Sequence, residues 1–252
     1  IAGAVVFGAA WAFIPAYLQA TRGSHVVITT IMFNFIAASL MVFLLVDVIR
    51  DTAQMGPHTV ALPKEQWFPS FKDFAGLFGI KIRYSPLNIS FLLAILASVF
   101  VWFLVWKTRW GYEMRAVGHN TQAAIYAGIS PYKNIIIAMC ISGGLAGLLG
   151  VNEILGVHHK IVAGFPAGYG FTGIAVALMG RNHPIGIFPA AFLFGILYQG
   201  GSEVTFDMPN ITRYMFVAVQ GVIILFSGAL ENLFRPQIES FFVNRLNIKA
   251  SA

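Results

Sequence analysis

The chain has 252 residues, of which 58% are hydrophobic and 10% charged, and its formal net charge is +6. Water-soluble domains contain about 25% charged residues, so this composition excludes a soluble globule and indicates a protein that crosses a membrane several times. In such a protein the basic residues inform orientation, and we expect no nucleic-acid partner. The single cysteine, Cys140, excludes an internal disulfide. The chain begins with Ile1 and is apolar at once, so we expect it to be N-terminally truncated.

Seven segments are candidates for membrane helices, which need roughly 20 apolar residues each. They are 1–19, 26–46, 88–106, 134–155, 169–180, 184–200 and 213–229. The fifth would be only about 18 Å long as a helix, which is too short to span alone. The predicted fold class is therefore all-α, a polytopic transmembrane helical bundle with about seven membrane segments, one of them short or re-entrant.

The connections between these segments predict the topology of a single transmembrane domain, 1–252. Placing the polar connection 107–133 inside the cell puts nine lysine and arginine residues inside and seven outside, which follows the positive-inside rule by a small margin. Residues 47–87 then form an extracytoplasmic loop, which we expect to be an ordered cap because prolines alternate there with aromatic residues. Residues 230–252 become a cytoplasmic tail.

The connection 107–133 contains a short helix with clear start and stop signals. Asn120 is a good N-cap, Thr121–Ala127 contains no helix breaker, and Gly128 followed by Pro131 is a good stop. A helix of about two turns is marginal alone in water, so it needs to dock to become rigid. Two interpretations remain open from the residues alone: an amphipathic connector on the lipid surface, or an element that docks into a partner protein.

The surface of this helix suits docking. Ala123, Ala124 and Ala127 have almost no side-chain bulk, and Tyr126 and Ile129 project as apolar side chains.

Polar residues inside the apolar segments are candidates for a transport path. An ionisable group within a membrane segment is costly, so Glu153, beside Asn152, is a functional candidate. It either lines the path or faces interfacial water at the outer end of its segment. A proton relay is disfavoured, because no second intramembrane acid or histidine pairs with it. The amides of Asn34 and Gln220 either bond neighbouring helices together or line the path.

Aromatic residues and glycines mark two further features. Phe165, Tyr169 and Phe171 would stack on a base or sugar, or else anchor the chain at the membrane interface. Gly143 and Gly147, like Ala146 and Gly150, are four residues apart, which predicts a helix-packing face.

The sequence contains no motif for covalent chemistry or for binding ATP. It has no G-x-x-x-x-G-K-[ST] phosphate loop, and no spacing of cysteine and histidine that would hold zinc. We therefore predict a protein that is not an enzyme, with no metal and no cofactor, whose ATP, if transport uses it, binds to another subunit.

Four stretches resemble one family of transport proteins. They are "VITTIMFNFIA" (27–37), "GYEMRAVGHNTQAAIYAGI" (111–129), "SGGLAGLLGVNEILGV" (142–157) and "GYGFTGIAVALMGRNHPIGI" (168–187). Together they resemble the permease subunits of bacterial ABC importers, in the ribose/branched-chain amino acid permease superfamily and its branch for nucleosides and simple sugars. The resemblance covers nearly the whole chain, is weakest in 47–87, and lacks the family's N-terminal helices.

The resemblance implies a multi-pass protein of the bacterial inner membrane that imports nucleosides or simple sugars. Its implied partners are an ABC ATP-binding subunit, a second and different permease subunit, an extracytoplasmic substrate-binding protein, and membrane lipid. It also implies that the helix in 107–133 is a coupling helix, which rests in a cleft of the ATP-binding subunit. The residues that would carry this coupling are Glu113, Arg115, Gly118, Asn120, Ala123, Ala124, Ala127 and Gly128.

Two other classes of function compete with this interpretation. An ion-coupled secondary transporter would need clusters of membrane carboxylates, and only Glu153 offers one. An intramembrane enzyme would need a nucleophile and base, or a metal site, at membrane depth, and the sequence suggests neither.

Overall fold

The structure is a computed structural model that describes residues 1–49, 56–69, 87–165, 168–208, 215–223 and 225–226. The chain divides into two compact units, Ile1–Ala167 and Gly168–Ala252, and each is described by itself. Among the described residues every regular element is a helix, and an isolated antiparallel bridge joins His58 to Val162. The predicted all-α class is therefore confirmed.

Within the described residues, five helical segments are long and apolar enough to cross a membrane: Ala2–Arg22, Val26–Val48, Ser90–Lys107, Pro131–His158 and Pro184–Phe206. They correspond to α1 (Ala2–Arg22), α2 (Val26–Phe43) with its π-helical end η1 (Leu44–Val48), α4 (Ser90–Lys107), α7 (Pro131–Val151) with its π-helical end η3 (Asn152–His158), and α9 (Pro184–Asp207). The chain is thus a polytopic helical bundle.

The two remaining predicted segments differ in kind. The fifth is α8 (Tyr169–Met179), an apolar helix of 11 residues, as short as its sequence predicts. It ends at a tight turn in which Arg181 and Asn182 have positive φ, and a Cβ on Gly186 would lie 2.4 Å from the Gly180 carbonyl oxygen. The seventh segment is helical over 215–223, and parts of it lie outside the described residues.

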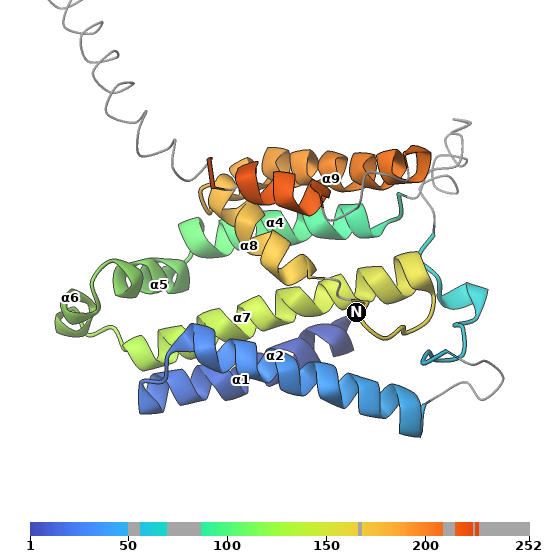
Figure 1. The fold of residues 1–252 in the computed structure, drawn as a ribbon. Helices are drawn as coiled ribbons and strands as arrows, with labels where there is room; N and C mark the ends of the chain where they lie inside the picture. The colour runs from blue at the N-terminus through green and yellow to red at the C-terminus, as the bar shows by residue number, and fades with distance from the viewer. Residues whose placement is uncertain (50–55, 70–86, 166–167, 209–214, 224, 227–252) are drawn as a thin grey trace, which may run out of the picture. The chain divides into compact units, whose positions relative to one another are not determined.

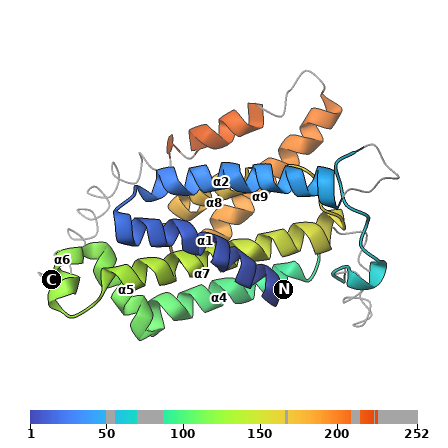
Figure 2. The ribbon, with the colours of Figure 1, turned by 90° about the horizontal axis from the view of Figure 1, so that it is seen from below.

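Helices α1 and α7 pack side by side through small residues (Figures 1 and 2). A Cβ on Gly8 would lie 2.3 Å from the Gly143 carbonyl oxygen, and one on Gly147 would lie 2.3 Å from the Ala4 carbonyl oxygen. Close backbone approach of this kind holds helices together in membranes, where no hydrophobic force drives them together. The packing face predicted for Gly143 and Gly147 is confirmed, whereas Gly150 has nothing within 4 Å of a built Cβ.

The described part of the 47–87 connection, residues 56–69, is held against the residues that follow η3. The amide N–H of Thr59 donates to the Ile161 carbonyl at 3.1 Å, and that of Leu62 donates to the His159 carbonyl at 2.8 Å. The Trp67 indole stacks on the His159 ring at 3.7 Å between centroids. These contacts order residues 56–69, which contain the short 3-10 helix η2 (Lys64–Gln66), and the position of this connection outside the membrane stays a prediction. Residues 70–86 lie outside the described part.

Candidate functional site

Two further helices, α5 (Arg109–His119) and α6 (Thr121–Tyr126), fill the connection between α4 and α7 (Figure 1). The corner between α4 and α5 is fixed at Thr108. Its hydroxyl donates to the Leu104 carbonyl at 2.5 Å and accepts from the Gly111 N–H at 3.1 Å. A Cβ on Gly111 would lie 2.2 Å from the Leu104 carbonyl oxygen, so only glycine fits there. Helix α5 is therefore attached stiffly to the end of a membrane span.

Helix α6 begins where the sequence predicts and ends within one residue of the predicted end. The Asn120 side chain accepts a hydrogen bond from the Ala123 N–H at 3.1 Å, which confirms the N-cap. The helix stops one residue earlier than predicted, at Tyr126, and Gly128 follows with φ of 77°, a left-handed conformation that glycine adopts without strain.

The two alanines of α6 and Ala127, its C-cap, do not share one face. Ala124 is 3% exposed, whereas Ala123 and Ala127 are exposed. Tyr126 is 91% exposed and Ile125 is 50% exposed, so the outer surface of α6 combines small residues with projecting apolar side chains. Apolar side chains exposed together in this way mark a contact surface more often than a surface in water.

Three of the residues predicted to couple to the ATP-binding subunit lie on α5, in the same connection as α6: Glu113, Arg115 and Gly118. Glu113 forms an ion pair with Arg109, with 3.1 Å between Nε and Oε1, and Arg115 and Gly118 are exposed. Such an exposed pair one helical turn apart contributes only about 0.3–0.5 kcal/mol, so it shapes the charge of the surface more than it stabilises the fold.

Glu153 lies in a polar network at the far end of α7. It is 7% exposed, its Oε1 accepts from the Asn152 amide at 3.2 Å, and its Oε2 lies 3.6 Å from Nε2 of His158. The Ser90 hydroxyl bridges the Asn152 and Asn88 amide oxygens and, having one proton, donates to one of them at a time. The Asn88 amide donates to the Gly156 carbonyl at 3.1 Å.

This network joins the start of α4 to the π-helix η3. Glu153 is buried, so it does not face interfacial water as one of the two interpretations had it. The sequence argument that no histidine pairs with Glu153 was also wrong, because the π-helical turn brings His158 round to it. A buried carboxylate needs partners of this kind.

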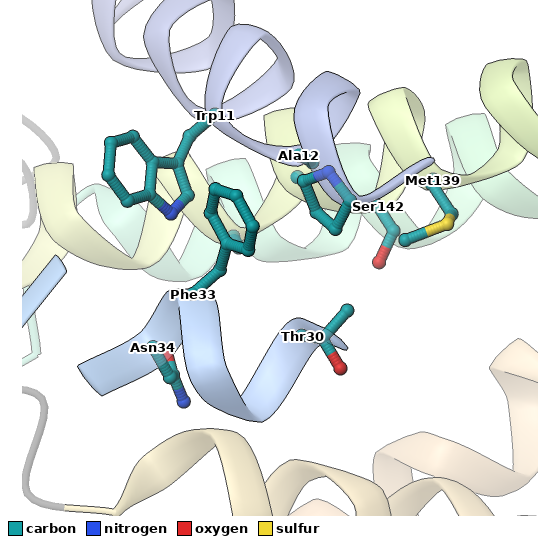
Figure 3. Close-up of a pocket in the computed structure, with 10 residues that line it drawn as sticks. Trp11, Ala12, Thr30, Phe33, Asn34, Met139 and Ser142 are labelled. Carbon is teal, nitrogen blue, oxygen red and sulfur yellow. The ribbon is translucent and has the colours of Figure 1, made fainter. Parts of the chain in front are cut away.

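A pocket of about 280 Å³ lies between α1, α2 and α7 (Figure 3). Ten residues line it: Trp11, Ala12, Pro15, Thr30, Phe33, Asn34, Met139, Ser142, Gly143 and Ala146. The predicted path residue Asn34 is among them. On α2, Phe33 and Asn34 lie three and four residues after Thr30, and this spacing places all three on one face of the helix.

Two aromatic rings form one wall of this pocket. The Trp11 and Phe33 rings lie 5.9 Å apart at an interplanar angle of 72°, an edge-to-face arrangement that fixes both rings (Figure 3). The polar lining consists of an amide on Asn34 and hydroxyls on Thr30 and Ser142, and no charged side chain lines the pocket. The arrangement suits an uncharged molecule with a flat ring and hydrogen-bonding groups.

The other predicted path residues lie elsewhere. Asn152 and Glu153 belong to the polar network and do not line the pocket. Phe165 is half-buried in the turn after η3. In the second unit, Tyr169 packs against Tyr198 at 6.2 Å between ring centroids, Phe171 is 64% exposed, and Gln220 is half-buried in the helix at 215–223.

Sequence reasoning overlooked Trp11, Phe33 and Ser142, because an aromatic residue or a serine in a span is common and nothing in the pattern shows which helices meet. It also treated α5 as part of a loop, although the 11 residues contain no proline. Across the described ranges, no group of three or more histidine, cysteine or acidic side chains could hold a metal ion.

Residues 1–228 match a protein family described as the permease component of branched-chain amino acid transport systems. No solved structure gave a significant match.

Three curated relatives are similar to most of the chain. The guanosine ABC transporter permease protein NupP of Bacillus subtilis is 36% identical over 88% of this chain and 62% of its own length. The nucleoside ABC transporter permease protein NupB of Lactococcus lactis is 36% identical over 85% of this chain and 59% of its own. The glucose ABC transporter permease protein TsgB13 of Haloferax volcanii is 32% identical over 97% and 64%. The chain thus spans less than two thirds of the length of each.

Proposed function

Since the chain belongs to the family of permease components described for branched-chain amino acid transport systems, we propose that it is the membrane subunit of an ATP-driven ABC importer for nucleosides or simple sugars. In this role it forms part of a translocation path in the cell membrane and performs no covalent chemistry. Two relatives named for guanosine or nucleosides and one named for glucose support this range of substrates.

The observation that carries the proposal is the α5–α6 surface. A motion at this surface reaches the membrane through the Thr108 corner, because α5 is tied to α4 by two hydrogen bonds and the close approach at Gly111. The exposed Tyr126 and the small exposed side chains of Ala123 and Ala127 suit insertion into a groove of a partner.

The partner on this surface is an ATP-binding subunit, with the ATP bound there. The same proposal includes a second permease subunit, different from this one, that completes the path, and an extracytoplasmic binding protein that delivers substrate. The α5–α6 connection is then cytoplasmic, and the cap formed by 56–69 lies outside the cell.

Co-purification tests this function. The full-length protein is solubilised from membranes as the native chain, as the double variant Ala123→Glu with Ala127→Glu, and as Ala123→Ser with Ala127→Ser. An ATP-binding subunit should accompany the native chain and the serine variant, since both keep a small surface, and should be lost with the glutamate variant, which adds bulk and charge. Recovery of equal amounts with all three, or of none with any, contradicts the proposal.

The alternative of an ion-coupled secondary transporter has one observation in its favour, the buried Glu153 beside His158. A secondary transporter moves its substrate without ATP, so uptake measured in the same membranes without ATP tests this alternative directly.

A further inference from the structure

We propose that the pocket between α1, α2 and α7 binds the base of a transported nucleoside, with the Trp11 indole as the stacking surface and Asn34 as the hydrogen-bonding group. The inference rests on the proposed transport function and narrows its substrate class from nucleosides or sugars to nucleosides.

The pocket lies near the middle of three spans. Trp11 is the tenth of the 21 residues of Ala2–Arg22, Asn34 is the ninth of the 23 residues of Val26–Val48, and Ser142 is the twelfth of the 28 residues of Pro131–His158. Each is therefore within about 5 Å of the centre of its span along the helix axis, at about 1.5 Å per residue. Transporters hold their substrates near the midplane of the bilayer.

Two polar groups of the pocket, the Asn34 amide and the Ser142 hydroxyl, are exposed and are not used by the fold. No hydrogen bond joins the Asn34 amide or the Ser142 hydroxyl to another residue in the part of the chain that the structure describes. Polar groups left without partners in hydrocarbon are costly, and they are tolerated where they line a cavity that water or a ligand enters. Both side chains are exposed in the single chain, so an amide and a hydroxyl lie open in the middle of two spans on one pocket, where water or a ligand satisfies them and lipid does not.

The chemistry of these groups restricts the ligand. The Asn34 amide both donates and accepts, and so does the Ser142 hydroxyl. The Thr30 hydroxyl already donates to the Val26 carbonyl at 2.8 Å, so it has only acceptor capacity left. With no charge in the lining, a neutral ligand with mixed donors and acceptors fits, and a nucleotide phosphate does not.

The aromatic wall favours a base over a sugar. Trp11 and Phe33 are half-buried, so part of each ring is open. Planar bases stack on aromatic side chains with their whole π-face, with little dependence on which base is present. A sugar ring contacts an aromatic face through its C–H groups alone. The volume of about 280 Å³ is at the lower end of ligand pockets, which suits one ring system with its sugar extending beyond it.

Thiol labelling of the full-length protein in its transporter complex tests the site. Cys140 and any cysteine outside residues 1–252 are first replaced, and then Asn34→Cys, Ser142→Cys and Phe7→Cys are introduced singly. Phe7 is 79% exposed on α1 and does not line the pocket, so it is the control position outside the pocket. Each variant is treated with a small water-soluble methanethiosulfonate, which reacts only with a thiol that ionises in contact with water.

The proposal expects Asn34→Cys and Ser142→Cys to react, and it expects guanosine to leave the reactivity of Phe7→Cys unchanged. Saturating guanosine should slow the reaction at the two pocket positions by about tenfold, whereas ribose at the same concentration should have no effect. An unreactive pocket cysteine overturns the inference, because the pocket then faces lipid or another chain. Equal protection by ribose, or no protection, also overturns it.

A second readout isolates stacking. Trp11→Phe keeps an aromatic surface and Trp11→Leu removes it, so the inference expects KM for guanosine uptake to rise about tenfold in the leucine variant and to be largely restored by phenylalanine. Unchanged KM in both contradicts it. If the ATP-binding subunit co-purifies and nucleoside is taken up without protection at the pocket, the site assignment fails while the transport function stands. If no ATP-binding subunit is recovered, the transport function fails, and protection by guanosine alone decides the site.

Discussion

Nε2 of His158 lies 3.6 Å from Oε2 of Glu153, and both residues belong to the π-helical turn that ends the α7 span. An α-helix would place residues five apart on different faces, and the wider π-turn brings them together. The contact gives the buried Glu153 carboxylate a partner that the sequence did not suggest. It also suggests that Glu153 stabilises the fold, which can be tested by mutation.

Replacing Glu153 by alanine should destabilise the protein by about 1–3 kcal/mol, because the Asn152 amide and the His158 ring lose their shared partner in a buried site. Glu153→Gln keeps the acceptor for Asn152 and should cost less. Thermal unfolding in detergent, followed by size-exclusion chromatography, measures both. If Glu153→Gln is as stable as the native chain yet transports nothing, the carboxylate is part of the transport path and a structural role is insufficient.

Gly111→Ala should uncouple transport from ATP. The added Cβ would lie 2.2 Å from the Leu104 carbonyl oxygen, so α5 must shift away from α4. We expect uptake to fall by about tenfold or more, because a displacement of α5 by about 1 Å disturbs the alignment on which the rate depends. Gly3→Ala, at a helical glycine with nothing within 4 Å, is the control and should leave uptake unchanged. Equal uptake by the two variants would show that the α4–α5 corner is not required.

Gly147→Ala should loosen α1 from α7. Its Cβ would lie 2.3 Å from the Ala4 carbonyl oxygen, and overpacking of this kind costs about 1–3 kcal/mol. Gly150→Ala, on the same helix, meets nothing within 4 Å and should be neutral or slightly stabilising. The melting temperatures of the two variants in the same detergent decide the matter, and a larger loss at Gly150 would refute the packing account.

Asn120→Ala should weaken helix α6 by about 1 kcal/mol, because the Ala123 N–H loses its cap. Asn120→Ser retains a capping oxygen and should behave nearly as the native chain does. Hydrogen exchange over 121–126 reports the difference without any partner present. Unchanged protection in the alanine variant would mean that contacts of Ala124, and not the cap, hold the helix in place.

Hydropathy predicted the spans because each is long and apolar. The capping residue Asn120 and the stop residue Gly128 predicted α6, because such signals are local and need no tertiary information. The Glu153–His158 contact was not predicted, since it depends on a π-turn that no residue announces. The pocket was only partly predicted: Asn34 stands out as a polar residue in a span, whereas Trp11 and Phe33 acquire meaning only when α1 and α2 meet. The length of a helix and its capping residues depend on the local sequence, whereas the choice of which helices pack together depends on the whole fold.

Transport by the complete complex in sealed vesicles tests the central claim most directly. The full-length protein with its co-purified partners is reconstituted with or without trapped ATP, and labelled guanosine is added together with the extracytoplasmic binding protein. The account predicts accumulation only with ATP, and its loss in the Ala123→Glu, Ala127→Glu variant. Accumulation at the same rate without ATP, or in that variant, would contradict it.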